Sequence, residues 1–248
     1  MQKEETVHKT LNKDGYSIHY FITGNRKNEA IVFLHPAFGD HRFFDKQTGF
    51  FSKEYCVITI DLMGHGMSQV QKSKDKIDSS ALHIHEILQA EGIEKAHLAG
   101  VSMGSLIVQD FVQKYPEKTL SLAATGGYNI HTKNEKVYKQ QKGEFFKWAF
   151  KILFSMNSFR KYIGSVAGIN EDTRKQAFES AQAITRKSLS VMPGMSNIVH
   201  YKEYTPHHYP LLIMVGDQDT ALAKEISKDW HEYDPQSLFI TIEDAGHC

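Results

Sequence analysis

A serine near the middle of the chain has the surroundings of a catalytic nucleophile. Ser102 is the centre of the pentapeptide GVSMG at residues 100–104, which follows a short apolar run at residues 96–99 and precedes a longer one at residues 105–112. A strand, a glycine-flanked turn and a helix expose a serine hydroxyl at a sharp turn, because larger side chains would clash at either glycine. We therefore predict that Ser102 attacks an electrophilic carbon.

A serine hydroxyl is a poor nucleophile near neutral pH unless a base takes its proton and a third group orients that base. The C-terminal part of the chain offers both groups at the ends of predicted strands. Asp217 and Asp219 follow an apolar strand predicted at residues 210–215, and His247 follows a strand predicted at residues 237–242. We predict His247 as the general base, with one of the two aspartates as its partner.

Four motifs occur in an order that resembles the α/β-hydrolase superfamily, specifically its serine-nucleophile, esterase-like branch with a helical cap. They are LHPAFG at residues 34–39, DLMGHGMS at residues 61–68, the Ser102 pentapeptide, and Gly-x-x-Asp at residues 216–219 followed by Gly-His at residues 246–247. The resemblance covers nearly the whole chain and implies an α/β fold with a doubly wound, mostly parallel sheet. It also implies that Asp219 is the triad acid, which leaves Asp217 as a turn-forming residue.

The resemblance implies an oxyanion hole of two backbone N–H groups, those of Met103 and Ala37. The loop after residue 34 departs from the common family pattern, because Pro36 stands where glycine is usual and cannot adopt positive φ. The Phe38 N–H therefore remains a rival donor, and we also expect the Phe38 side chain to bind substrate. We interpret His35 as a packed support beneath this loop.

The alternation of strand and helix patterns stops between residues 127 and 208. We predict a hydrolase core from residues 1–127 and 208–248 and a helical cap insertion from residues 128–207. Residues 128–200 contain 12 Lys and Arg but only 5 Asp and Glu, so the predicted cap is basic. In the core, the glycines of the motif at residues 61–68 permit a sharp turn, and we expect Asp61 and His65 to tie that loop down.

One predicted cap helix is apolar almost all round, apart from Lys147 and Lys151 on one face. Three interpretations remain open. In the first, the helix buries two faces while its lysines stay in water. In the second, its aromatic face lines an apolar pocket above Ser102, with Phe146, Trp148 and Phe150 as substrate-binding residues. In the third, Trp148 and the lysines anchor it at a membrane surface.

The other histidines do not form a metal-binding pattern. His83 and His85 lie two apart on a predicted helix and so face different directions, and no H-E-x-x-H or paired C-x-x-C motif occurs. We interpret His207 and His208 as a solvated loop pair. No phosphate-binding glycine motif occurs either, and we expect neither a metal nor a cofactor.

The net charge and the distribution of apolar residues limit the kinds of partner that the protein can bind. The formal net charge is +0, which provides no whole-molecule attraction to nucleic acid or to anionic membranes. Residues 1–8 are too polar for a signal peptide, and no apolar run is long enough to span a bilayer. We therefore expect a cytoplasmic protein with a small-molecule acyl substrate, no nucleic acid and no stable membrane association, and its oligomeric state stays open.

The resemblance implies a carboxylesterase-like serine hydrolase that cleaves a carboxylic ester or related acyl bond of a small, apolar substrate through an acyl-enzyme. Thioester, lactone, carbon–carbon and perhydrolase chemistry use the same triad and stay open. A serine at position 102 argues against the dehalogenase and epoxide hydrolase branches, whose nucleophile is aspartate. The alternative is a hydrolase-fold small-ligand receptor or signalling protein with little turnover. Relatives continue into a final helix beyond the catalytic histidine, so we expect these 248 residues to leave one sheet face apolar and exposed.

Overall fold

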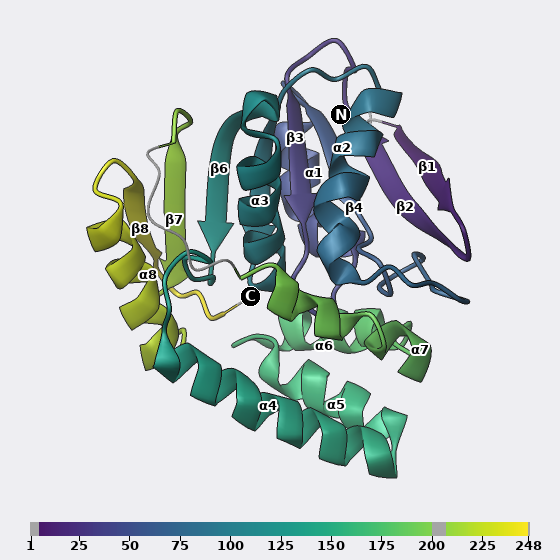
Figure 1. The fold of residues 1–248 in the computed structure, drawn as a ribbon, viewed down its shortest axis with the longest axis vertical. Helices are drawn as coiled ribbons and strands as arrows, with labels where there is room; N and C mark the ends of the chain where they lie inside the picture. The colour runs from purple at the N-terminus through teal and green to yellow at the C-terminus, as the bar shows by residue number, and fades with distance from the viewer. Residues whose placement is uncertain (1–4, 200–206, 248) are drawn as a thin grey trace.

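The computed structural model describes residues 5–199 and 207–247, which contain a single mixed sheet (Figure 1). Its strand order is β1-β2-β4-β3-β5-β6-β7-β8. The first two strands form an antiparallel hairpin at one edge, β2 pairs antiparallel with β4, and the remaining neighbours are parallel. The strands are β1 (Thr6–Lys13), β2 (Tyr16–Thr23), β3 (Ala30–Leu34), β4 (Cys56–Ile60), β5 (Ala96–Val101), β6 (Thr119–Thr125), β7 (Leu211–Gly216) and β8 (Leu238–Ile242).

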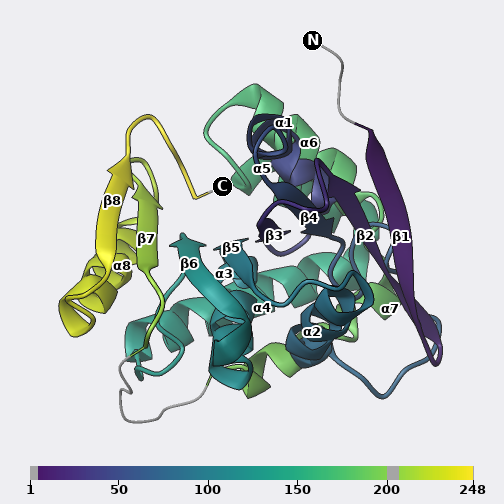
Figure 2. The ribbon, with the colours of Figure 1, turned by 90° about the horizontal axis from the view of Figure 1, so that it is seen from above.

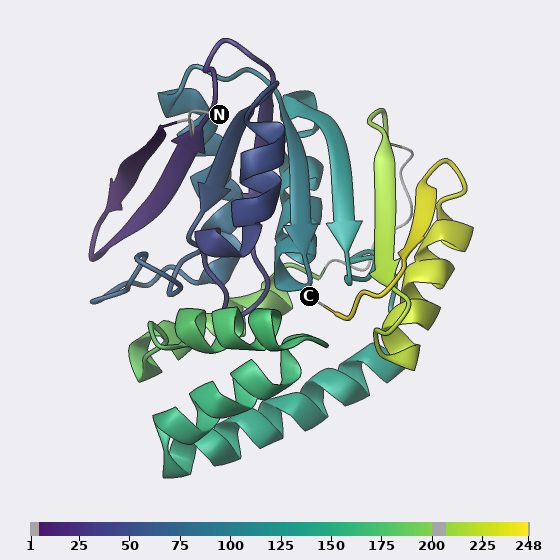
Figure 3. The same ribbon diagram turned by 180° about the vertical axis from the view of Figure 1, so that it is seen from behind.

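Helices cover the two sheet faces unequally. The helix α1 (Asp45–Phe51) lies over one face, as Figure 3 shows, and α2 (Ser80–Ala90), α3 (Met103–Lys114) and α8 (Ala221–Tyr233) lie over the other. Side chains of α2, α3 and α8 share the main apolar core with the sheet. This arrangement confirms the predicted doubly wound α/β fold.

The burial of the central strands explains their place in the sheet. Every residue of β3 and β4 is buried, as expected for short apolar strands that have helices or neighbouring strands on both sides. In β2, buried residues alternate with half-buried ones along most of the strand, which fits a strand nearer the edge. Because β3 to β8 pair in parallel, their carboxyl ends lie at one edge of the sheet.

A helical segment between β6 and β7 covers that carboxyl edge (Figures 1 and 2). It consists of α4 (Glu135–Phe154), α5 (Met156–Val166), α6 (Glu171–Ala181) and α7 (Arg186–Leu189), followed by the 3-10 helix η4 (Met192–Asn197). Asn134, Ser155 and Asn170 cap the first three helices, because each side chain accepts a hydrogen bond from a backbone N–H of the first turn. The cap boundaries at 128 and 207 stay a prediction, and residues 200–206 lie outside the described part.

Shorter 3-10 helices complete the chain: η1 (His41–Phe44), η2 (Ile77–Ser79) and η3 (Pro116–Lys118). Among the residues that the structure describes, no helix has both the length and the apolar content needed to cross a bilayer.

Candidate active site

Ser102 lies in a strained turn between β5 and α3. Its backbone has φ 51° and ψ −114°, a conformation with positive φ that residues carrying a Cβ rarely adopt. The flanking glycines make this turn possible, because a Cβ added at Gly104 would lie 2.1 Å from the carbonyl oxygen of Leu34 and one at Gly100 would lie 2.3 Å from the carbonyl oxygen of Gly104. The local sequence thus holds the serine at the carboxyl edge of the sheet.

Three side chains from distant parts of the sequence form a hydrogen-bonded chain at this edge. The His247 Nε2 atom lies 3.0 Å from Ser102 Oγ. The Nδ1 atom of the same ring lies 2.9 Å from Oδ2 and 3.1 Å from Oδ1 of Asp219. In this geometry Nδ1–H donates to the carboxylate, which leaves Nε2 free to accept the serine proton.

The two candidate acids have different environments. The Asp219 side chain is fully buried, and its Oδ1 also accepts a hydrogen bond of 2.6 Å from the Thr220 N–H. Asp217 is exposed, and its Oδ1 accepts a hydrogen bond of 3.2 Å from the Ala245 N–H. The structure therefore brings Asp219 to His247. Asp217 instead bonds to Ala245, in the loop that carries His247.

Gly126 contributes to the site, although the sequence reasoning did not assign it a role. It follows β6 with φ +60°, and a Cβ added there would lie 3.3 Å from both Nδ1 and Cε1 of His247. A larger residue would therefore press on the imidazole ring. The signal in the sequence is the glycine pair at residues 126–127, directly after β6.

The loop after β3 lies against the start of α3. Gly39 N–H donates to the carbonyl of Pro36 over 3.0 Å, which closes a turn whose positive φ of 67° falls on Phe38. Pro36 is thereby accommodated, because the left-handed residue is two positions later. Met103 is the first residue of α3, so its N–H has no intrahelical acceptor. Ala37 lies in the same turn, and both residues remain our proposed oxyanion donors.

Known proteins with similar sequences identify the family of this chain. A profile for the alpha/beta hydrolase fold matches residues 29–153, which is half of the chain. The chain belongs to the α/β-hydrolase fold family. Lipase 3 of Moraxella sp. (strain TA144) is 25% identical over 246 residues, which cover 92% of this chain and 74% of the lipase.

Solved structures agree with the fold of this α/β hydrolase. A carboxylesterase of Nitrososphaera gargenis superposes with a TM-score of 0.80 at 15% identity, covering 96% of this chain and 91% of the other. A carboxylesterase of Bacillus subtilis superposes with a TM-score of 0.73 at 17% identity, covering 98% and 85% of the two chains.

The loop after β4 of this α/β hydrolase is fastened by buried polar groups. Asp61 Oδ1 accepts hydrogen bonds from the backbone N–H and from Nδ1 of His41, and its Oδ2 accepts one from the Met67 N–H. Burial raises the pKa of this carboxyl, but the bonds from His41 and Met67 outweigh it and hold the pKa below its usual range. His65 Nδ1 lies 3.0 Å from the Met63 carbonyl, so both predicted loop residues form such contacts.

His35 joins the loops after β3 and β4. Its Nδ1 donates to the carbonyl of Pro36 over 2.8 Å, and its Nε2 accepts a hydrogen bond of 3.0 Å from the Leu62 N–H. Burial lowers the pKa of His35, which favours the neutral ring that these two bonds require. His35 therefore supports the turn that contains Ala37.

Ligand-type atoms of Asp40, His41 and Asp61 lie within 4.8 Å of one another, a grouping that the sequence analysis did not identify. Asp40 binds the guanidinium of Arg42, with the shortest contact at 2.6 Å, and Asp61 binds His41. These carboxylates therefore already have cationic or N–H partners within the protein.

The aromatic residues assigned to substrate binding separate into two groups. Phe38 is buried, and its ring makes edge-to-face contacts with Trp148 and Phe159 at 5.1 Å each. Phe146 and Phe150 are mostly exposed instead, because a spacing of two residues from Trp148 places them on the other side of α4. The structure does not bring them to the triad, which corrects their assignment as substrate-binding residues. Their exposure also argues against the interpretation in which this helix buries two faces.

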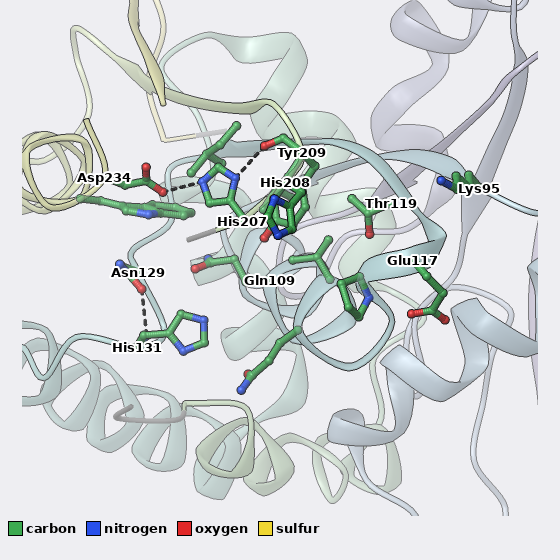
Figure 4. A pocket seen from close by; sticks show the side chains of 16 residues that line it. Lys95, Gln109, Glu117, Thr119, Asn129, His131, His207, His208, Tyr209 and Asp234 are labelled. Atoms are coloured by element: carbon green, nitrogen blue, oxygen red, sulfur yellow. Dashed lines mark hydrogen bonds and ion pairs between the residues drawn. The ribbon is translucent and has the colours of Figure 1, made fainter. Parts of the chain in front are cut away.

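A cavity of about 630 Å³ lies away from the triad, between α3, α8 and the segment before β7 (Figure 4). His207 lines it, with Nδ1 2.6 Å from the Tyr209 carbonyl and Nε2 2.7 Å from Asp234 Oδ2. His207 is therefore a partly buried, bonded side chain, which corrects its interpretation as a solvated residue, whereas His208 is exposed. The sequence could not show that the end of α8 would lie beside this histidine.

Proposed function

We propose that this α/β hydrolase is a serine hydrolase that cleaves a carboxylic ester, or a related acyl bond, of a small apolar substrate through an acyl-enzyme. The observation that carries the proposal is the chain of hydrogen bonds from Ser102 Oγ through His247 to the buried Asp219 carboxylate. The lipase and carboxylesterase names among the similar proteins support ester chemistry.

In the first half-reaction, Ser102 Oγ attacks the acyl carbon while His247 Nε2 takes its proton. Asp219 stabilises the imidazolium that forms, because its carboxylate accepts the Nδ1–H bond throughout. The N–H groups of Met103 and Ala37 bind the oxyanion of the tetrahedral intermediate, and a single such donor typically lowers the barrier by about 3 kcal/mol. Protonated His247 then gives its proton to the leaving alcohol.

In the second half-reaction, His247 takes a proton from water as the water oxygen attacks the acyl-enzyme. The bond from the acyl carbon to Ser102 Oγ then breaks, His247 returns the proton to Oγ, and the acid is released. The acyl group would bind beside an apolar cluster that joins Phe38 to α5 and α6. This cluster consists of Phe38, Phe159, Ile163, Ala181 and Ile184, with Trp148 packed against it. These five residues are buried, so the cluster forms an apolar backing to the site, and it disfavours a charged acyl group beside it.

The test compares native protein with Ser102→Ala. The native protein should react with a fluorophosphonate probe and hydrolyse p-nitrophenyl butyrate, whereas the variant should not be labelled and should lose kcat/KM by about a thousandfold or more. Failure of the native protein to react, or equal rates for the two proteins, would favour the small-ligand receptor or signalling alternative.

A further inference from the structure

The helix α4 has two faces with different roles. Its inner face contacts the site region, since half-buried Trp148 packs on Phe38 and Ile152 packs on the same apolar cluster. Its outer face points away from the sheet, because α4 is the outermost helix on that side of the molecule in both Figure 1 and Figure 3. The inner face accounts for the position of the helix, and the outer face needs a separate explanation.

The outer face of α4 is aromatic. Its large apolar side chains are between 62% and 73% exposed, which is unusual for so many residues of one helix. Three of them, Phe146, Phe150 and Phe154, recur at intervals of four residues and so lie on one side of the helix. The exposed set consists of Tyr138, Phe146, Phe150, Leu153 and Phe154. The Phe150 and Phe154 rings lie 4.7 Å apart, centroid to centroid, so they pack on each other at the surface.

Basic side chains accompany these rings. Lys139 and Lys142 are exposed on the same side of the helix, and Lys147 is exposed at its margin. Beyond the first turn of α4 the sequence contains one acidic residue, Glu144. Its carboxylate is bonded by Lys147 and by the Tyr162 hydroxyl, at 2.7 and 2.8 Å, towards α5. The outer face therefore combines apolar rings with a local excess of positive charge.

We propose that the outer face of α4 docks reversibly on an anionic lipid surface, with the helix lying parallel to that surface. Aromatic and leucine side chains insert at the depth of the lipid headgroups, while the lysine side chains extend to the phosphates. Charge complementarity selects an anionic surface, because each Lys close to it contributes about 1 kcal/mol. The residues that dock are Phe150, Leu153 and Phe154 rather than Trp148, which the structure places on the inner face.

This inference goes beyond the proposed hydrolysis and does not depend on it. It has a consequence for the site, because the inner face of the same helix contacts Phe38 in the turn that contains Ala37. Docking would therefore place the lipid surface against the helix that covers the proposed acyl-binding cluster.

The experiment measures flotation of the full chain with vesicles, without any catalytic readout. Vesicles of phosphatidylcholine with about 30 mol % phosphatidylglycerol should carry the native protein up the gradient, and pure phosphatidylcholine should carry about fivefold less. The variant Leu153→Ser/Phe154→Ser should bind the anionic vesicles about tenfold more weakly, because two exposed apolar side chains are lost. Lys139→Gln/Lys142→Gln should also weaken binding, as should about 0.5 M NaCl.

Phe50→Ser is the matched control, since Phe50 is equally exposed but lies on α1. It should float like the native protein. Circular dichroism should show unchanged folding for all variants, because the replaced side chains are exposed. Absence of native binding to both vesicles, or equal binding by native protein and Leu153→Ser/Phe154→Ser, would overturn the proposal. A native dimer that becomes monomeric in that variant, without lipid binding, would overturn it too and assign the face to a second copy.

Discussion

Ser102 holds a backbone conformation that costs about 1–3 kcal/mol and persists only where the surrounding structure enforces it. The close approach of Gly104 to the end of β3, and of Gly100 to Gly104, supplies that enforcement. The same approach brings the first turn of α3 against the turn that contains Ala37. The same glycine contacts therefore hold Ser102 in its strained conformation and bring α3 against the turn that contains Ala37.

Replacing Gly104 should show how tightly this turn is packed. In Gly104→Ala the new methyl would lie 2.1 Å from the Leu34 carbonyl oxygen, so the free energy of unfolding should fall by about 1–3 kcal/mol. Gly143→Ala is the control, because a Cβ there has no neighbour within 4 Å and lies in a helix, and it should gain about 0.5–1 kcal/mol. Urea denaturation measures both, and equal stability of the two variants would refute the packing argument.

The two aspartates of the loop after β7 should differ in catalysis. Asp219→Asn keeps the size of the side chain but removes the charge that stabilises the histidine, so kcat should fall about a thousandfold to ten-thousandfold. Asp217→Asn should change kcat less than about fivefold, because the exposed Asp217 side chain accepts a hydrogen bond from Ala245 rather than from the imidazole of His247. Steady-state hydrolysis of p-nitrophenyl butyrate distinguishes them, and similar losses in both variants would contradict the assignment.

At the scale of elements, buried polar side chains fix how loops and helices meet. His35 joins the loops after β3 and β4, and a second such contact lies on the side of α2. There His83 Nε2 lies 2.9 Å from the Tyr16 hydroxyl, which donates to Asp75 over 2.7 Å. Burial, with a smaller effect from Lys13, lowers the pKa of His83 from 6.5 to about 4. Such a ring is neutral in the folded protein at pH values where the unfolded chain would protonate it.

This difference in pKa predicts how stability depends on pH. The contribution of neutral His83 is complete above pH 6.5 and is lost as the pH falls from 6.5 towards about 4, because the unfolded chain then binds a proton that the folded chain does not. The slope is at most about 1.4 kcal/mol per pH unit for one proton. His83→Asn should flatten the profile in that range, whereas replacement of exposed His208 should not. Urea titrations at several pH values check it, and an unchanged slope in His83→Asn would disprove the assignment.

At the scale of the molecule, the sheet is covered on one side more completely than on the other. The residues Leu238, Ile240 and Ile242 of β8 are 38% to 68% exposed. Figure 3 shows the sheet face that α1 covers in part, and no helix of the described residues lies over the half of that face formed by β6, β7 and β8. These side chains form an exposed apolar patch on β8, and such a patch promotes association in water.

A charge on that patch should reduce self-association. Ile240→Lys should lower the weight-average mass at high protein concentration, while Thr241→Lys, which adds the same charge on the opposite side of β8, should have a smaller effect. Sedimentation velocity over a concentration series measures both. If native protein stays monomeric throughout, or the two variants behave alike, the patch does not drive association.

The sequence by itself indicated the strands and the turn at Ser102 through local signals, and it indicated the fold through the resemblance that its four motifs carry. Apolar runs with turns between them define the parallel strands, and the glycines around Ser102 define a turn that few other residues allow. His247 and the pair Asp217 and Asp219 could be identified for the same reason, since each follows an apolar strand. A short motif that directly follows a predicted strand can be placed at the carboxyl edge of the sheet from the sequence alone.

Only the tertiary structure decided which side chains face one another. The second half of α4, residues 145–154, is apolar apart from Lys147 and Lys151 and gives no clear periodicity from which to choose its inner side. Its packing alone turned Trp148 inwards and Phe146 and Phe150 outwards. The contact between His207 and Asp234 likewise joins residues from separate elements, and the space that Gly126 leaves for His247 depends on two loops meeting. Such contacts depend on how whole helices and strands pack on one another, and local sequence patterns do not determine that packing.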